Sequence, residues 1–147
     1  MPIKYKINQA TRNDISDHLT DCKDSFNPPL DQRVDIDIYA QKIYNNADTF
    51  EAWHGEILIG LVAVYCNDVE KTAYITSVSV NDNFINKGVA SNLLKKCIGH
   101  VESLHLNEIA LKVNILSDKA RKLYEKFDFQ DSEFKDGFVL MRRVYDK

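Results

Sequence analysis

The chain has few of the signals that place a protein in a membrane, a secretory pathway or a metal-binding class. Its 147 residues contain no apolar run that approaches the roughly 20 residues of a membrane helix. Residues 1–10 lack the apolar core of a signal peptide. Cys22, Cys66 and Cys97 form no C-x-x-C pair or Cys/His cluster, so neither a disulfide framework nor a metal site is expected. We therefore expect a cytoplasmic protein with no membrane partner.

Two common phosphate-binding loops and a nucleic-acid-binding composition are also missing. Neither G-x-x-x-x-G-K-[ST] nor G-x-G-x-x-G occurs in the sequence. No nucleic-acid partner is expected, because the net charge is −3 and no aromatic-rich basic motif is present.

The charged residues are unevenly distributed along the chain. Residues 1–85 hold 7 Lys and Arg against 13 Asp and Glu, a net of −6, whereas residues 86–126 hold 8 against 4, a net of +4. This separation suits an anionic cofactor and a cationic second substrate, although solvated helix faces are the simpler explanation of any single charge.

The spacing of apolar residues predicts elements in the order β-α-α-β-β-β-α-β-α-β-β. Strands are expected at residues 3–9, 49–54, 57–66, 72–80, 108–114, 128–134 and 137–145. Helices are expected at residues 14–25, 34–46, 88–104 and 117–127. The length fits one domain over residues 1–147. The expected fold class is α/β (α+β), a mixed sheet of about seven strands with helices on both faces.

The segment between the strand 72–80 and the helix 88–104 carries the first functional signal. A helix start offers free N–H groups and the positive end of the helix dipole, which together bind anions. Gly88 lets the backbone approach an anion without an intervening Cβ, and Ala90 is small for the same reason. Ser91 adds a hydroxyl and Lys87 a nearby cation. The alternative is an ordinary strand–loop–helix connection that contains a glycine.

A second constellation follows the strand 108–114. Asn114 ends that strand, Ser117 can cap the next helix, and Tyr124 lies two helical turns beyond Ser117 on the same face. A phenol with an ordinary pKa of about 10 can protonate a departing thiolate whose conjugate acid has a pKa of about 8.5. The alternative makes Tyr124 a core aromatic with its hydroxyl at the rim.

Together these two segments resemble the GCN5-related N-acetyltransferase (GNAT) family. Its first signature, [QR]-x-x-G-x-[GA], has its counterpart in Ile85-Asn86-Lys87-Gly88-Val89-Ala90. Its second, Asn followed by A-x-x-L-Y-x-K-x-G-F, has its counterpart in Asn114, Ser117, Ala120, Leu123, Tyr124, Lys126, Asp128 and Phe129. The order of elements matches as well, so the resemblance covers nearly the whole chain. Two residues depart from it: Ile85 replaces the usual Gln or Arg, and Asp128 replaces the usual Gly.

The resemblance implies an acyltransferase that moves an acetyl group from acetyl-CoA directly to a primary amine in a ternary complex. CoA would lie between the strands 72–80 and 108–114, with the backbone near Val78 and Val80 bonded to its pantetheine arm. Asn114 would anchor the cofactor or an ordered water, and Tyr124 would protonate the thiolate. The implied cofactor-binding residues are Val78, Val80, Ile85, Asn86, Lys87, Gly88, Val89, Ala90, Ser91, Asn114 and Ser117.

The general base and the acceptor stay open. The histone-modifying branch of the family uses a Glu on the fourth strand, near the position of Tyr74. The other candidates are Glu70, Asp82, His54 or water.

The acceptor is a small molecule, such as an amino acid, an amino sugar or a polyamine-like compound, or a protein amine. It is expected to meet the first two helices and residues 27–34, where Asp31 and Arg33 offer both charges. The alternative function is a degenerate CoA-binding sensor or interaction module, and a structural protein without a cofactor is a third. A homodimer is possible for each of these functions.

Overall fold

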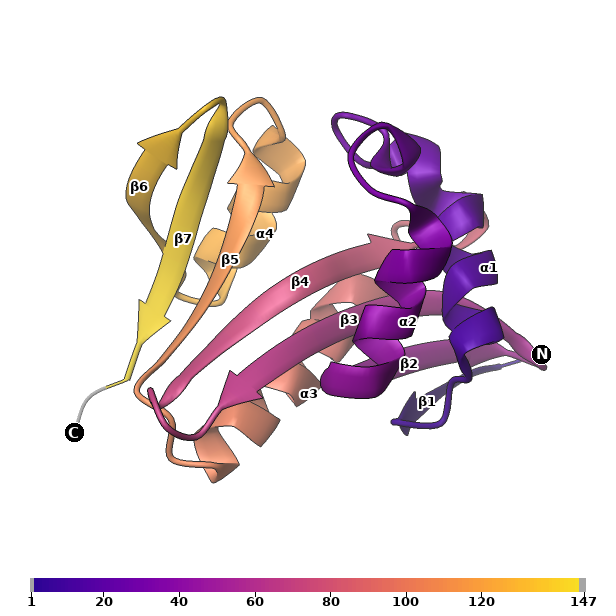
Figure 1. Ribbon diagram of the computed structural model, residues 1–147, viewed down its shortest axis with the longest axis horizontal. Coiled ribbons are helices and arrows are strands. Elements are labelled where there is room, and N and C mark those ends of the chain that lie inside the picture. The colour runs from indigo at the N-terminus through magenta and orange to yellow at the C-terminus, as the bar shows by residue number, and fades with distance from the viewer. Residues whose placement is uncertain (1, 146–147) are drawn as a thin grey trace.

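A seven-stranded mixed sheet carries helices on both of its faces (Figure 1). The computed structural model describes residues 2–145. The strands are β1 (Ile3–Ile7), β2 (Asp48–His54), β3 (Ile57–Asn67), β4 (Thr72–Val80), β5 (Glu108–Asn114), β6 (Gln130–Lys135) and β7 (Phe138–Val144). They lie in the order β1-β2-β3-β4-β5-β7-β6, and β4 and β5 are the parallel pair. The predicted fold class and order of elements are confirmed.

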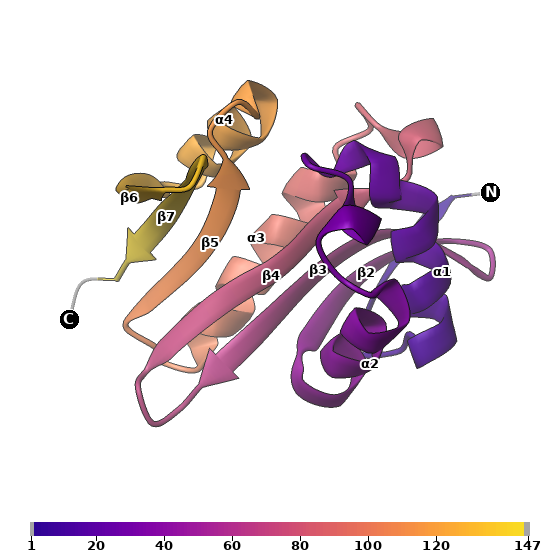
Figure 2. The same ribbon diagram turned by 45° about the horizontal axis from the view of Figure 1, so that its top comes forward.

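Two helices cover each face of the sheet (Figures 1 and 2). On one face lie α1 (Arg12–Cys22) and α2 (Ile36–Asn46), joined through the short 3₁₀ turns η1 (Lys23–Ser25) and η2 (Leu30–Gln32). On the other lie α3 (Val89–Ser103), preceded by η3 (Asp82–Phe84), and α4 (Asp118–Lys126). Each pair of helices lies over one buried apolar cluster. None of the described helices is long and apolar enough to cross a membrane.

Residues with a left-handed backbone set several boundaries that differ from the predicted ones. β1 ends at Ile7 because Asn8 has a φ of 56°. Asp128 has a φ of 67° after α4, so β6 starts at residue 130 and not at 128. Short polar side chains tolerate this conformation better than most, which explains how an Asp occupies the position where the family has Gly. Asp136 and Gly137 both have positive φ and form the hairpin turn between β6 and β7.

The parallel strands β4 and β5 separate at their carboxyl ends. Only residues 72–75 pair with residues 108–111, while β4 continues beside β3 and β5 continues beside β7. Figure 1 shows the resulting divergence between the two strands. This divergence leaves the facing edges of both strands without each other as hydrogen-bond partners.

A bulge in β4 accompanies this separation. Ile75 pairs with Val64 and Ser77 pairs with Ala63, so Thr76 is an extra residue. The Tyr39 hydroxyl of α2 donates a hydrogen bond to the Thr76 carbonyl at 2.7 Å. A bulge bends its strand and increases its twist, which turns β4 away from β5 beyond this point.

The same bulge also changes which side chains of β4 face α3 and which face α1. Ile75 packs in the cluster under α3, and after the bulge Val78 and Val80 pack against that same cluster. Without an extra residue, strand alternation would point residues 78 and 80 to the opposite face. Ser79 instead faces α1, where its hydroxyl lies 2.8 Å from Nε2 of the buried His18. Burial lowers the pKa of His18 to about 4, so a neutral ring accepts this hydrogen bond and holds the end of β4 against α1.

Gly60 of β3 permits the close approach of α3 to the sheet. A Cβ at this position would lie 2.8 Å from Cγ1 of Val89 and 3.2 Å from Cδ1 of Leu93. Val89 is the first residue of α3. The start of that helix therefore rests directly on a glycine, a contact that the sequence analysis did not anticipate.

We expect Gly60→Ala to reduce the free energy of unfolding by about 1–3 kcal/mol, because Val89 and the first turn of α3 must move. Gly99→Ala is the matched control: Gly99 lies within α3 and a Cβ there meets nothing within 4 Å. That variant should gain about 0.5–1 kcal/mol from helix propensity. Urea unfolding of both variants and the parent measures these changes. Equal stability of the two variants would contradict the close contact.

Candidate active site

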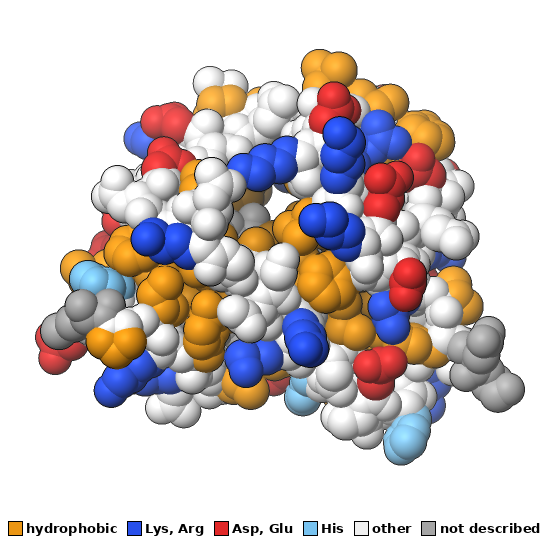
Figure 3. All heavy atoms as spheres, turned by 180° about the vertical axis from the view of Figure 1, so that it is seen from behind, with side chains coloured by type: hydrophobic (Ala, Val, Ile, Leu, Met, Phe, Trp, Pro, Cys, Tyr) orange, Lys and Arg blue, Asp and Glu red, His pale blue; other side chains and the backbone are white. Residues whose placement is uncertain are grey.

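A large cavity lies between the carboxyl-terminal half of β4, the β4–α3 turn and α4. Its volume is about 920 Å³. Seen from the side of α3 and α4, the surface is hollowed, with Lys and Arg side chains at its rim (Figure 3). Predicted cofactor-binding residues that line it are Val78, Val80, Ile85, Asn86, Gly88, Val89, Ala90, Ser91 and Ser117. We call it the larger cavity.

The amino terminus of α3 opens into the larger cavity. Gly88 is the N-cap with a φ of 75°, and a Cβ on it would meet nothing within 4 Å. No side chain among the described residues caps the helix. The backbone N–H of Asn92 donates to the Gly88 carbonyl, so the N–H groups of residues 89–91 precede the first helical hydrogen bond. These free donors and the helix dipole suit an anionic group.

The turn before Gly88 is shaped by polar contacts. Asn86 has a φ of 65°, and its Oδ1 accepts a hydrogen bond from Nζ of Lys119 at 3.2 Å. This contact ties the β4–α3 turn to α4 across the larger cavity. Ile85 is 40% exposed and contributes an apolar surface. Lys87 is exposed and lies outside the cavity lining.

Three lysines of α4 line the larger cavity and were not selected from the sequence. Lys119, Lys122 and Lys126 follow a spacing of three and four residues, which places them on one face of the helix. That spacing was the available signal. Asp118 is the one acidic residue among the described residues of the lining, which therefore carry a net positive charge.

A smaller cavity of about 310 Å³ lies on the side of α1 and α2. Its wall includes Asn27, Arg33 and Tyr39 from the α1–α2 region, and Tyr74 from β4. The two cavities share six lining residues, which are Ser25, Phe26, Val78, Ser117, Ala120 and Tyr124. They therefore meet in the gap between β4 and β5.

Tyr124 borders both cavities. Its side chain is 7% exposed and packs edge-to-face on Phe129, with ring centroids 6.1 Å apart. Burial raises the pKa of Tyr124 above its ordinary value, so the phenol keeps its proton across the physiological pH range. The residue is thus a buried, protonated phenol at the junction of the cavities. Its ring also belongs to the core, so the two interpretations from the sequence are compatible.

Asn114 lies at the smaller cavity and not at the larger one. Its Nδ2 donates a hydrogen bond to the Asn27 carbonyl at 3.1 Å, and its Oδ1 accepts from the Leu116 N–H at 2.9 Å. It therefore fastens the end of β5 to the α1–α2 connection. Ser117 is the N-cap of α4 but its side chain makes no capping hydrogen bond.

The general-base candidates are dispersed. Glu70 accepts a hydrogen bond from Asn67 in the β3–β4 turn, and Asp82 accepts one from Ser25 at 3.1 Å. His54 lies against Phe84, with ring centroids 5.1 Å apart. None of these three lines either cavity.

Tyr74 lines the smaller cavity, but burial raises its pKa, so its phenol stays protonated and cannot accept a proton from an amine. No Asp, Glu or His is found among the described residues that line the smaller cavity.

Known proteins share the sequence pattern and the fold of this chain. The model of the acetyltransferase (GNAT) family matches residues 12–129. An uncharacterized N-acetyltransferase of Bacillus subtilis (strain 168), CgeE, is 35% identical over 78 residues, which are 53% of this chain and 30% of that protein. The matched segment is thus under a third of the length of this curated relative.

Two solved structures share the fold along nearly their whole length. PH1933 from Pyrococcus horikoshii OT3 has a TM-score of 0.79 at 21% identity, covering 99% of this chain and 100% of that one. The PaiA N-acetyltransferase of Thermoplasma acidophilum, solved in complex with coenzyme A, has a TM-score of 0.78 at 14% identity, with the same coverage. At these identities the likeness shows the fold.

We expect CoA to bind in the micromolar range, about 7–8 kcal/mol. Gly88→Glu should abolish this binding, because it places bulk and negative charge at the amino terminus of α3. Gly137→Glu is the matched control: Gly137 also has positive φ and open space around its Cα, but lies in the β6–β7 turn. Calorimetric titration of folded variants measures the effect. Unchanged CoA affinity in Gly88→Glu would refute the phosphate site.

Proposed function

Because the chain belongs to the GNAT family of acetyltransferases, we propose that it moves an acetyl group from acetyl-CoA to a primary amine by direct transfer. We further propose that residues 1–147 form a single acetyltransferase domain. The observation that carries it is the meeting of two cavities from opposite faces of the sheet at Val78 and Tyr124. Donor and acceptor can then occupy separate cavities and react where these join.

CoA fits the larger cavity by charge and shape. Its pyrophosphate would lie at the free N–H groups of residues 88–91, and the lysines of α4 would face its phosphates. Its pantetheine arm would lie along Val78 and Val80. Beyond residue 75, β4 has no pairing with β5, so its exposed edge offers backbone hydrogen bonds to the arm and to the thioester carbonyl.

The proposed reaction needs no covalent enzyme intermediate. The neutral amine attacks the thioester carbonyl carbon, a C–N bond forms, and the resulting oxyanion is stabilised by β4 backbone N–H groups. The C–S bond then breaks, and Tyr124 gives its proton to the CoA thiolate. The amide nitrogen loses its extra proton to water, since no carboxylate or imidazole of the described residues lines the smaller cavity. The tyrosinate recovers a proton from solvent.

The smaller cavity favours an acceptor with an acidic group. Arg33 and Lys112 line it, and no acidic residue does so in the part of the chain that the structure describes. The Arg33 guanidinium lies 5.6 Å from the centre of the Phe138 ring. The buried Ser77 hydroxyl, which has no hydrogen-bond partner among the described residues, also lines it. We therefore infer an amino-acid-like acceptor and disfavour a polyamine. The cationic second substrate that charge asymmetry suggested does not match this wall.

A CoA-binding sensor without turnover is the second candidate, favoured by Ile85 and by the absence of a carboxylate among the described residues that line the smaller cavity. A screen of amines with detection of released thiol separates the two candidates. Acetyl-CoA-dependent thiol release with one acceptor class supports the enzyme. Tight CoA binding without release above background hydrolysis supports the sensor.

We expect Tyr124→Phe to reduce turnover roughly 100-fold, about 2.7 kcal/mol of transition-state stabilisation, because the ring remains and only the proton donor is lost. CoA affinity should change little. Tyr44→Phe, on the exposed face of α2, is the matched control and should retain full turnover.

The comparison requires saturating substrates and thermal melts that show equal folding. If a folded Tyr124→Phe protein turns over within about threefold of the parent, Tyr124 is not the general acid.

We expect Arg33→Ala to raise the KM for an acidic acceptor about tenfold, which corresponds to about 1.4 kcal/mol for a charge-assisted hydrogen bond at a partly exposed site. The KM for a neutral amine and for acetyl-CoA should not change. Arg12→Ala, at the start of α1, is the matched control. Steady-state kinetics with paired acidic and neutral acceptors measures the effect. An equal rise for both acceptors would contradict an electrostatic role.

A further inference from the structure

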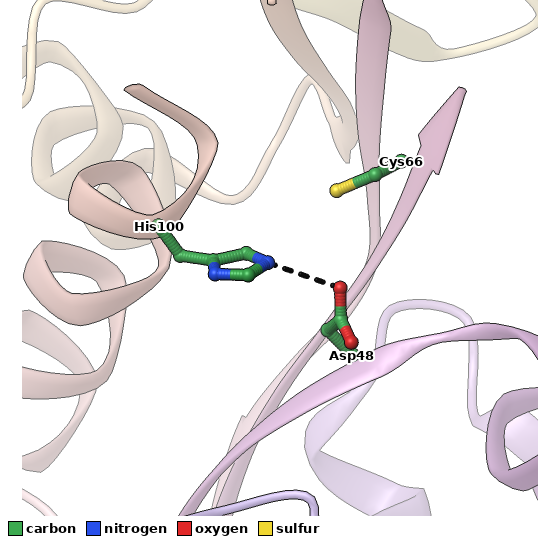
Figure 4. Close-up of side chains that lie close together, drawn as sticks. All are labelled: Asp48, Cys66 and His100. Carbon is green, nitrogen blue, oxygen red and sulfur yellow. Dashed lines mark hydrogen bonds and ion pairs between the residues drawn. The ribbon is translucent and has the colours of Figure 1, made fainter. Parts of the chain in front are cut away.

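Three metal-ligating side chains come together on the α3 face of the sheet. Asp48 is the first residue of β2, Cys66 lies near the end of β3, and His100 lies in the last turn of α3. Their carboxylate oxygen, Sγ and imidazole nitrogen all lie within 4.8 Å of one another. Figure 4 shows the three side chains pointing toward a common space from two strands and a helix.

The register of the sheet explains this juxtaposition. Asp48 pairs with Val64, and Cys66 lies two residues further along β3 on the same face. Diagonal neighbours of this kind are within reach of each other's side chains. His100 is placed over them because α3 packs on this part of the sheet, with its ring 5.5 Å from that of Phe50. Rigid elements therefore position all three groups.

Hydrogen bonds already orient the carboxylate. Oδ2 of Asp48 lies 3.1 Å from Nε2 of His100, while Oδ1 accepts from Nδ2 of Asn8 at 3.2 Å. Asn8 is itself fixed, because its Oδ1 accepts from the Thr49 N–H at 2.8 Å. Outer partners of this type orient the ligands of metal sites.

We propose that Asp48, Cys66 and His100 bind a zinc-type divalent cation. One sulfur, one nitrogen and one oxygen ligand are the donors that Zn²⁺ accepts, with a water in the fourth tetrahedral position. Tetrahedral bonds of about 2.0–2.3 Å place ligand atoms about 3.3–3.8 Å apart, so side-chain movements of about 1 Å complete the site.

The charges and protons balance on binding. The carboxylate and the thiolate together neutralise the 2+ ion, and the Cys66 thiol proton passes to solvent. The proton that His100 Nε2 shares with Oδ2 of Asp48 leaves as the metal binds, so the ring coordinates through Nε2 and carries its proton on Nδ1. The half-buried side chains of His100 and Asp48, 31% and 35% exposed, leave an entry path from solvent.

This site is separate from the acetyl-transfer site. His100 lies 12 residues after Gly88, roughly 18 Å along the axis of α3, and none of the three ligands lines either cavity. The ion would link β2, β3 and the end of α3 that is remote from the CoA site. The sequence did not predict it, because the ligands are 18 and 34 residues apart.

The test uses metal-free protein titrated with Zn²⁺ by calorimetry and with Co²⁺ by absorption. The parent should bind one equivalent, and Co²⁺ should give a thiolate charge-transfer band with strong visible d–d bands. Cys66→Ala and His100→Ala should each weaken binding by at least the 10–100-fold that changes in outer partners cost, and Cys66→Ala should remove the charge-transfer band.

Two matched controls keep the same residue types outside the cluster. Cys22→Ala alters a Cys/His contact on the opposite face, where Cys22 Sγ lies 3.8 Å from His18, and His105→Asn alters an exposed histidine. Both should bind like the parent. Asp48→Asn preserves the size of the side chain, and it tests the site if Cys66→Ala or His100→Ala fails to fold. Absence of binding, or binding that survives Cys66→Ala and His100→Ala, would overturn the proposal.

Discussion

The extra residue at Thr76 is the constraint on which both cavities depend. The extra residue reverses the alternation of side chains along β4. Val78 and Val80 therefore face α3, on the side of the larger cavity, and Ser79 faces α1. By bending β4, the extra residue ends the pairing with β5 and opens the gap where the cavities meet. The Tyr39 hydroxyl stabilises the bulge from the opposite face. A regular strand would close the gap with backbone hydrogen bonds.

Features encoded by local periodicity could be predicted from the sequence, and features created by tertiary register could not. The helix start at Gly88 and the turn at Asp136-Gly137 are local, and the structure has both. Gly60 is needed because α3 packs closely on β3, and this contact joins residues that are far apart in the sequence. The bulge at Thr76 likewise requires the pairing of β3 with β4. The three lysines of α4 could have been predicted to act together, because Lys119, Lys122 and Lys126 share a helical face.

The uneven charge of the sequence agrees with the wall of the larger cavity and not with the wall of the smaller one. The basic excess of residues 86–126 places three lysines on the wall of the larger cavity, as an anionic cofactor requires. The acidic excess of residues 1–85 does not reach the smaller cavity, whose charged residues are Arg33 and Lys112. Net charge describes a segment, whereas a pocket is formed by the few side chains that the fold turns inward.

The six residues common to both cavities also bear on how inhibitors of this protein would behave. A single compound that joins the CoA sulfur to an acceptor amine would pass through the gap between β4 and β5 and fill both cavities. Once its CoA portion is held at α3, its amine portion is present at a high effective concentration. Such a compound pays the loss of translational and rotational freedom once, so its affinity would exceed that of either portion alone.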